Sequence, residues 1–439
     1  MLKSHIRPVA SALVLAAMSM TAAAVVSTPA VAQKNEEAPK PPKPSRKAQK
    51  DLGEVQKLLG AEDYEGAKAK IAEMEAKGTL TEEDLYYVTN FKLQAGLQLK
   101  DDPLVESALE GMVANKYTPA SEVPKIQNNL VALALQAENY PKAIERLNQV
   151  LETNPNNVEA ILNIGRIHYQ QGDYANAIAS FQRGIETANR NGERPEEDTY
   201  KLLAQTAMQA KDNAVLQSAM VGLVTTYPNP TNWRDALVLY RDQQGITDPM
   251  ILDSYRLQLA NNALAGERDY IEMAELAHKR GLPGETKAVI EKGLAENVFE
   301  QGKAAANELL NLSKGRAAQD LKDLPGLEKE AQAAKTGDLA AATVGQGWMS
   351  HGNYAKAVEF YKLGLEKGVR NPDEANLHYG IALVGAGRPD EAKAAFAAVG
   401  GNLKQLADLW AIHAAQKAGG GQPQAADGAA ADGAEAGGE

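Results

Sequence analysis

Apolar residues recur at helical spacing along most of this 439-residue chain, and two stretches repeat each other at an interval of about 34 residues. Each stretch has an aromatic residue, a small residue three positions later and a large apolar residue four positions after that. A fixed period of this length predicts helix-turn-helix units that stack on copies of themselves. The two sets are Tyr140, Ala143 and Leu147, and Tyr174, Ala177 and Phe181.

The pattern extends to further units. The clear pair occupies residues 124–157 and 158–191, and a second pair lies near the C-terminus with an offset of 35. Fainter units open near Ala48 and Glu197. Residues 269–293 also favour a helix pair, with a turn at Leu282-Pro283-Gly284. The positions that define the register in the clear units include Gly165, Gly345, Tyr354, Ala357, Gly380, Ala392 and Phe396.

These units resemble the tetratricopeptide repeat, whose copies of about 34 residues carry small, aromatic and proline positions in the same order. The resemblance implies an all-α, right-handed superhelical solenoid. Gly165 and Ala177 would sit where the two helices of a unit cross, because only small side chains let helix axes approach to about 8–10 Å. Pro155 would end one unit and start the next.

A longer similarity links two weaker regions. Residues 100–113 match residues 211–224 at an offset of 111, close to three repeats, which suggests a duplicated block or a chance match of helix-forming residues. Residues 301–337 resemble the repeat least. We therefore expect a helical array over 48–300, a divergent helical linker or hinge over 301–337, and a C-terminal repeat pair over 338–416.

The two ends of the chain differ from this central part. Residues 1–32 have a basic start, an apolar run and a small-x-small pattern before Gln33, which predicts a secretory signal peptide, with an N-terminal membrane anchor as the alternative. Residues 33–47 are rich in proline and indicate an extended linker, either a plain spacer or a docking peptide. Residues 417–439 are Gly, Ala and acidic residues with nothing large to bury, so a disordered tail is expected.

The composition excludes several kinds of chemistry and several classes of partner. The chain has no cysteine, which excludes disulfides, thiolate nucleophiles and the cysteine-dependent lipid anchor of bacterial lipoproteins. Removing Lys3 and Arg7 with the signal would take the formal charge from −11 to −13. Nucleic acid and anionic lipid are therefore poor partners for this chain. Export to the periplasm, with possible envelope association, is the expected location.

In a solenoid of this kind the first helix of each unit lines a concave groove that takes a peptide or a partner helix. Asn129 and Asn163 occupy the same repeat position, where the resemblance implies contact with a peptide backbone; the alternative is that both merely face solvent or cap a helix. The paired Lys and Asn of the family's carboxylate-binding groove are not evident. The full set of groove candidates is Asn128, Asn129, Gln136, Leu162, Asn163, Arg166, Tyr169 and Gln170.

No catalytic constellation is visible in the sequence. The histidines are scattered, no His-Glu-x-x-His or phosphate-binding glycine loop occurs, and no cofactor or metal is expected. The favoured hypothesis is a non-catalytic periplasmic scaffold that binds a protein or peptide of the cell envelope. The alternative is a cell-wall or glycan-binding protein. In that alternative the aromatics would stack on sugar rings, namely Trp233, Tyr240, Trp348 and Tyr361.

Overall fold

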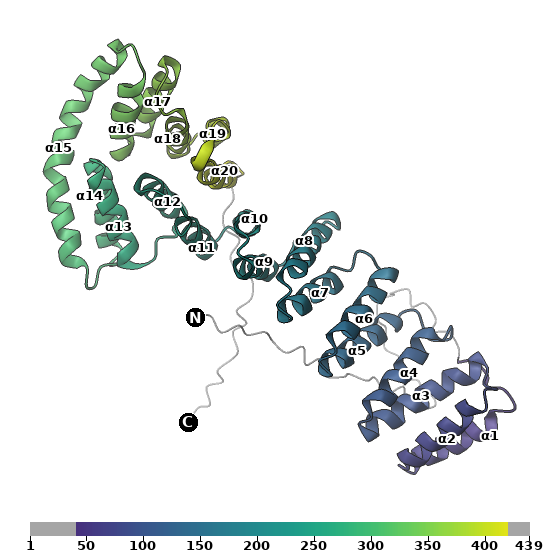
Figure 1. Ribbon diagram of the computed structural model, residues 1–439. Coiled ribbons are helices and arrows are strands. Elements are labelled where there is room, and N and C mark those ends of the chain that lie inside the picture. Colours follow the sequence, from purple (N-terminus) through teal and green to yellow (C-terminus); the bar gives the residue numbers. More distant parts are fainter. Residues whose placement is uncertain (1–40, 420–439) are drawn as a thin grey trace, which may run out of the picture. The chain divides into compact units, whose positions relative to one another are not determined.

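The computed structural model describes residues 41–419, and within that range every regular element is a helix (Figure 1). The expected all-α architecture of stacked helix pairs is confirmed. The chain divides into two compact units, the first ending at Pro195 and the second beginning at Glu196. The predicted signal peptide (1–32), most of the predicted Pro-rich linker and the predicted tail from residue 420 lie outside the described residues.

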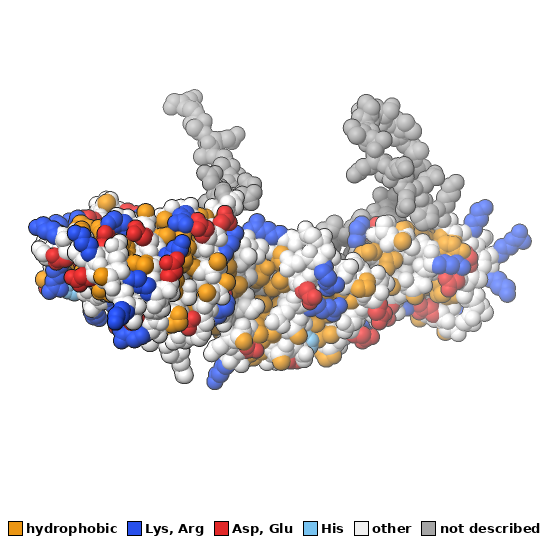
Figure 2. All heavy atoms as spheres, turned by 90° about the horizontal axis from the view of Figure 1, so that it is seen from above, with side chains coloured by type: hydrophobic (Ala, Val, Ile, Leu, Met, Phe, Trp, Pro, Cys, Tyr) orange, Lys and Arg blue, Asp and Glu red, His pale blue; other side chains and the backbone are white. Residues whose placement is uncertain are grey.

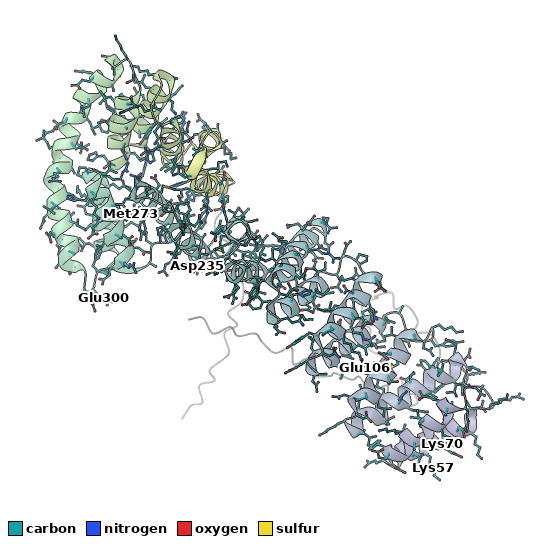
Figure 3. All side chains as sticks on the ribbon, viewed as in Figure 1. Lys57, Lys70, Glu106, Asp235, Met273 and Glu300 are labelled. Atoms are coloured by element: carbon teal, nitrogen blue, oxygen red, sulfur yellow. The ribbon has the colours of Figure 1, made fainter. Side chains whose placement is uncertain are left out.

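The first unit consists of four antiparallel helix pairs, each packed on the next. Apolar side chains between the layers form a series of local cores, in which Val55, Leu109 and Ile161 are almost fully buried. Glu106 on α4 pairs with Lys142 of α6 at 2.5 Å and so links two pairs (Figure 3). The helices are α1 (Gln49–Gly60), α2 (Tyr64–Ala76), α3 (Glu82–Leu99), α4 (Asp102–Ala114), α5 (Val123–Gln136), α6 (Tyr140–Thr153), α7 (Val158–Gln170) and α8 (Tyr174–Arg190).

One turn geometry joins the two helices of every pair in this unit. The residue before the second helix is Asp or Asn, and its side chain accepts a hydrogen bond from the backbone N–H three residues later. Its own N–H donates to the carbonyl five residues back, which ends the first helix in a Schellman motif. The four N-caps are Asp63, Asp101, Asn139 and Asp173. This shared turn sets a common register for the four pairs.

The residue before each N-cap is left-handed, which predicts a stabilising substitution. Glu138 has φ 53°, whereas Gly172 takes the corresponding place in the next pair. A Cβ in this region costs about 1–2 kcal/mol, so Glu138→Gly is expected to raise the free energy of unfolding by about 0.5–1 kcal/mol after the entropic cost of glycine. Hydrogen exchange of the α5 and α6 amides measures it. The control Glu145→Gly, at an exposed site inside α6, should destabilise by about 1 kcal/mol.

Small residues sit where the paired helices cross. A Cβ added to Gly165 would lie 2.8 Å from the Phe181 ring, and one added to Gly380 would overlap the Phe396 ring. Gly345 approaches Tyr361 in the same way. In each of these pairs the glycine precedes the aromatic by the same interval, as the register requires. Other repeat positions with no exposed surface are Ala143, Ala177, Ala357 and Ala392, while Tyr140, Tyr174 and Tyr354 are half-buried.

A large side chain at one of these crossings should separate the helices. Ala177 on α8 has no exposed surface. Ala177→Leu is therefore expected to lower the free energy of unfolding by about 1–3 kcal/mol through overpacking. Faster exchange of the α7 and α8 amides, with α1 and α2 unchanged, would be the readout. Unaltered exchange throughout would show that Ala177 does not stand at the crossing.

The second unit has a less regular order. It begins with α9 and α10, which repeat the Asp-capped turn at Asp212, and it ends with α20. Met273, labelled in Figure 3, is a fully buried member of an apolar cluster formed by α12 to α15. The elements are α9 (Glu197–Ala210), α10 (Asn213–Thr226), α11 (Pro230–Arg241), α12 (Asp248–Ala260), α13 (Gly266–Lys279), α14 (Pro283–Ala295), α15 (Lys303–Ala333), the π-helix η1 (Leu339–Gly345), α16 (Gln346–Ser350), α17 (Tyr354–Lys367), α18 (Pro372–Gly385), α19 (Pro389–Ala397), the 3₁₀ turn η2 (Gly401–Leu403) and α20 (Lys404–Ala418).

Residues 301–337 are an integral part of this unit. Most of them form the single long helix α15, Lys303–Ala333, which packs on α13, α14 and η1 (Figure 1). Both ends are held from elsewhere: Glu267 accepts hydrogen bonds from three backbone N–H groups at residues 300–302, and the Lys367 ammonium donates to three carbonyls at the C-terminal end. The Lys367 bonds satisfy carbonyls that the C-terminal end of a helix leaves unpaired, and the Glu267 bonds fix the residues that lead into Lys303. The expected helix is present, but its clamped ends argue against a hinge.

The structure bears on the expected domain boundary and on the expected internal duplication. The boundary between compact units falls after Pro195 and not near residue 300, because α15 is packed into the second unit. The similarity of 100–113 to 211–224 has a structural counterpart. Gly111 faces Thr89 in the first unit, and Gly222 faces Tyr200 in the second. The second glycine and its partner both lie 111 residues after the first glycine and its partner. The α3–α4 and α9–α10 pairs thus share one internal packing.

Candidate functional site

Three exposed glutamines occupy one position of the repeat in the first unit. Gln98, Gln136 and Gln170 each lie three residues before the N-cap of the following helix, on α3, α5 and α7. Because the turns share their hydrogen bonds, the three amides project from the same side of successive pairs. None of them has a hydrogen-bond partner among the described residues, so each offers one acceptor and two donors. We call these three residues the glutamine row.

Apolar side chains border the glutamine row. Leu97, Leu135 and Tyr169 stand one residue earlier on the same helices and are half-buried. The Tyr169 ring lies 5.8 Å from that of Tyr174. A polar row beside partly exposed apolar surface can hold an extended segment, since the amides can bond to its backbone and the apolar residues can pack against its side chains.

The other predicted groove residues are distributed unevenly. Asn128 is exposed and Asn129 is half-buried, and no hydrogen bond to either side chain is present in the described structure. Asn163 differs, because its side-chain oxygen accepts a hydrogen bond from Arg166 at 2.7 Å. The two asparagines that share a repeat position therefore have different surroundings. Asn129 keeps its amide available, whereas Asn163 is partly engaged in holding Arg166.

Leu162 requires a correction. It was expected to face the groove, but it is only 6% exposed. Its side chain packs closely over Gly184 of α8, in the space that a Cβ there would need. Leu162 therefore belongs to the α7–α8 core and is not available to a partner. In α5 the corresponding residue is the exposed Asn128.

The end of the Pro-rich linker is bound to the first helices of this unit. The Tyr87 hydroxyl on α3 donates to the Pro42 carbonyl at 2.7 Å, and the Gln49 amide on α1 donates to the Pro44 carbonyl at 3.3 Å. The Ser45 N–H donates to the buried Asp84 carboxylate at 2.7 Å. Burial alone would raise the pKa of Asp84, but bonds from Thr81 and Ser45 lower it below its usual value.

Sequence reasoning did not identify Gln98, Tyr87 or Gln49 as site residues. The N-caps Asp101 and Asn139 are 38 residues apart, whereas Asn139 and Asp173 are 34 apart. A fixed period of 34 residues therefore does not align α3 with α5 and α7. Counting back from the N-cap would have found Gln98, because the signal is local to the turn. The same rule finds Gln209 before Asp212 in the turn after α9.

The second unit contains a buried charged cluster. Arg256 donates to Glu285 at 2.5 and 2.7 Å and to Asp253 at 2.6 Å, and His378 of α18 contacts Asp253 at 3.0 Å. Burial favours a raised pKa for Asp253, but His378 and Arg256 hold it down at about 2. The carboxylates are fully partnered within the protein. This cluster joins α12 and α14 to α18 and has no open side for a substrate.

The aromatics on which the glycan hypothesis rested are buried. Trp233, Tyr240 and Tyr361 are each 1% exposed, and Trp348 is 8% exposed. Tyr361 packs against His378 at 6.0 Å between ring centres. Sugar stacking needs an exposed ring face, so these four residues give that hypothesis no support.

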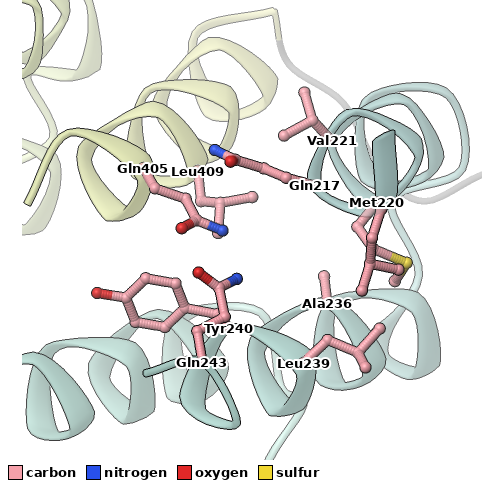
Figure 4. Close-up of a pocket in the computed structure, with 10 residues that line it drawn as sticks. Gln217, Met220, Val221, Ala236, Leu239, Tyr240, Gln243, Gln405 and Leu409 are labelled. Atoms are coloured by element: carbon pink, nitrogen blue, oxygen red, sulfur yellow. The ribbon is translucent and has the colours of Figure 1, made fainter. Parts of the chain in front are cut away.

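A hollow lies between α10, α11 and α20 within the second unit (Figure 4). Its empty volume is about 290 Å³ including solvent at its mouth. Gln243 and Gln405 point toward each other across it, while most of the remaining lining is apolar, as with Met220 and Leu409. The hollow holds no concentration of charge and no candidate nucleophile.

The charged side chains on the surface do not single out one binding site. On the face shown in Figure 2, acidic and basic side chains are interspersed over both units. Among residues 41–419 there is no group of three or more His, Asp or Glu residues placed to hold a metal ion. Within the same range, no helix is both long and apolar enough to cross a membrane.

Comparisons with known proteins agree with the helix pairs. Residues 129–192 match the tetratricopeptide repeat family model. A "DnaJ protein P58IPK homolog" from Arabidopsis thaliana is 24% identical over 277 residues, covering 60% of this chain and 55% of the relative. The chain thus spans about half the length of that relative.

Two solved structures are also similar, both at 15% identity. The C-terminal part of a TPR repeat-containing protein from Cytophaga hutchinsonii is covered over 99% of its length by 59% of this chain, with a TM-score of 0.30. Naa15/Naa10 bound to HypK-THB is matched over 67% of that chain and 84% of this one, with a TM-score of 0.25. The repeated turns, the small residues at the helix crossings and the family match together identify residues 129–192 as tetratricopeptide repeats.

Proposed function

We propose that this protein is a non-catalytic scaffold of the cell envelope, exported to the periplasm, whose first unit binds an extended segment of a protein partner. The observation that carries the proposal is the glutamine row. Three exposed amides without partners stand at one position of three successive pairs. Regularly spaced amides match the regularly spaced N–H and C=O groups of an extended peptide.

The proposed mode of binding depends on the backbone more than on side chains. Each glutamine can donate to a carbonyl and accept from an N–H of the bound segment. The half-buried Leu135 and Tyr169 add apolar contact beside it. Stacked repeats commonly use such extended surfaces to bind proteins. Export rests on residues 1–32, which carry the features of a secretory signal.

A matched pair of double variants tests the binding face. Gln136→Ala/Gln170→Ala removes amides from α5 and α7, and Asn148→Ala/Gln182→Ala removes exposed amides from α6 and α8. Partners are crosslinked in intact cells and identified by mass spectrometry, and the strongest is purified for a binding measurement. We expect the first variant to weaken binding at least tenfold and the second to leave it unchanged. Equal binding by both variants would refute the assignment of the face.

The location is tested separately. Fractionation of the cells should place the protein in the periplasm, and N-terminal sequencing of the purified protein should begin at Gln33. Recovery from the cytoplasm with residues 1–32 still attached would contradict export. That outcome would leave the binding face untouched, because the two tests share no readout.

A further inference from the structure

Basic side chains are concentrated at the start of the first unit. All the basic residues between positions 41 and 57 are exposed, and none of them forms an ion pair with another residue of the range 41–419. They are Lys43, Arg46, Lys47, Lys50 and Lys57. By contrast, every lysine between positions 58 and 99 has an acidic partner, namely Lys68, Lys70, Lys77 and Lys92. The unpaired cations are therefore a local feature of α1 and of the segment that leads into it, and we call these five residues the basic surface.

The acidic residues of α1 do not neutralise the basic surface, because lysines of α2 already pair with them. Asp51 contacts the ammonium groups of Lys70 and Lys77 at 3.1 and 3.0 Å. Glu54 contacts Lys70 at 2.9 Å. Lys57 of α1 and Lys70 of α2 are both labelled in Figure 3. These ion pairs join α1 to α2 and leave the lysines of α1 as uncompensated positive charge.

Two of the cations share one side of α1 with two glycines. Lys50, Gly53, Lys57 and Gly60 follow one another at separations of three or four residues, which keeps them on the same side of a helix. All four are exposed, and a Cβ added to either glycine would meet nothing within 4 Å. Packing inside the protein therefore does not require glycine at these positions, although a glycine such as Gly53 weakens an exposed helix. The glycines leave the helix backbone open to close approach between the two ammonium groups.

The segment that leads into α1 is held on the folded unit. The carbonyls of Pro42 and Pro44 accept hydrogen bonds from Tyr87 and Gln49 at 2.7 and 3.3 Å. Lys43 lies between these two bonded residues, so its backbone is fixed beside α1. Cations that are already held in place lose little conformational freedom when they meet a charged surface.

The chemistry of the basic surface fits an anionic membrane. α1 contains no aromatic residue to stack on nucleic-acid bases, and its exposed side has no large apolar side chain to anchor a partner helix. A layer of lipid phosphates needs neither of these, and each basic residue near an anionic membrane strengthens binding about fivefold. The negative net charge of the chain does not prevent this contact, because charges more than about 8 Å apart are largely screened at physiological ionic strength.

We propose that the basic surface docks the first unit on a membrane that carries anionic lipid headgroups. Its lysines and its arginine bind lipid phosphates electrostatically, and the glycine side of α1 lets the headgroups approach the helix closely. No part of α1 needs to insert into the lipid. This contact goes beyond the binding of a protein partner at the glutamine row and does not depend on it.

Sedimentation of the full chain with lipid vesicles tests the proposal. Vesicles that contain phosphatidylglycerol are expected to bind at least about tenfold more tightly than vesicles of phosphatidylcholine alone, and high salt should remove the difference. Lys50→Glu/Lys57→Glu should weaken binding at least about tenfold. The control Lys100→Glu/Arg183→Glu changes the net charge equally at exposed sites outside α1 and should change binding less than about twofold. Circular dichroism checks that both variants remain folded.

Two results would overturn the membrane assignment. The first is equal binding of both kinds of vesicle, or equal binding by the two double variants. The second is tighter binding to soluble polyglutamate or to a DNA oligonucleotide than to the anionic vesicles at the same concentration of negative charge. That result would indicate an acidic protein or a nucleic acid in place of a membrane.

The absence of native cysteine allows the contacting face to be located. A fluorophore is attached to Gly53→Cys on α1, or to Gln182→Cys at an exposed site on α8, and the vesicles carry a quencher on their headgroups. We expect at least twofold quenching from position 53 and little from position 182. Equal quenching at both positions would show that another face meets the membrane. Neither measurement involves a protein partner, so failure of docking would leave the glutamine row untested and unchanged as a proposed binding face.

Discussion

Arg256→Met is expected to cause the largest loss of stability in the second unit, about 3–5 kcal/mol in the free energy of unfolding. The Arg256 side chain is 8% exposed and bonds to both Asp253 and Glu285. Methionine fills similar space but removes the guanidinium from two largely buried carboxylates, of which Asp253 keeps only its contact with His378. An uncompensated buried charge costs far more than an exposed one, so the loss comes mainly from the partners left behind.

Tryptophan fluorescence during urea unfolding measures this effect selectively. All three tryptophans, Trp233, Trp348 and Trp410, belong to the second unit. The control is Arg268→Met, because the Arg268 side chain is 90% exposed and its contact with Glu272 is 3.9 Å. That control should change stability by well under about 1 kcal/mol. Equal unfolding midpoints for the two variants would show that the buried cluster does not hold the unit together.

The repeated turn explains how much of the fold could be predicted from sequence. An aromatic residue followed by a small residue three positions later is a local signal, and it located the second helices that begin at Tyr140, Tyr174 and Tyr354. The fixed period was less general. It fails where helices are longer, as in the 18-residue α3, and so the register that places Gln98 was not found.

Contacts between residues far apart in the sequence could not be predicted, because they leave no pattern in the sequence around either residue. Asp253 and His378 are 125 residues apart in sequence, and nothing around either residue indicates that they meet. The same holds for Glu267 and Lys367, which cap the two ends of α15 from other helices. Exposure at one repeat position also varies with the neighbouring pair. Asn128 is exposed on α5, whereas Leu162 at the same place on α7 is buried against α8.

A fall in pH from about 6.5 to about 4 is expected to destabilise the second unit through His413. The His413 ring on α20 is 2% exposed and contacts the rings of both Trp233 and Trp410. Its Nδ1 lies 2.9 Å from the side-chain oxygen of Asn261, the residue that follows α12. Burial, assisted by the charge of Lys417, lowers the pKa of His413 from 6.5 to about 4. A neutral ring suits this site, since its Nδ1–H can donate to Asn261.

The sign follows from proton binding in the two states. Between pH 6.5 and 4 the unfolded chain holds a proton on His413 that the folded chain does not, so stability rises with pH in this window and is lost as pH falls. The difference between the His413 pKa values of the unfolded and folded states corresponds to a loss of about 3 kcal/mol in the free energy of unfolding once the pH is below both values. Asp253 acts in a lower window: its pKa of about 2 in the folded state makes its contribution disappear only as pH falls from about 4 toward 2.

The urea midpoint of tryptophan fluorescence, measured at intervals from about pH 7.5 to 4, tests the assignment. His413→Asn keeps a donor near Asn261 but cannot take up a proton, so its midpoint should be nearly flat across the window where the unsubstituted protein loses stability. His278→Asn on α13 is the matched control and should retain the original slope. Should His413→Asn keep that slope as well, another group would be responsible, and α20 would not be the pH-sensitive contact of this unit.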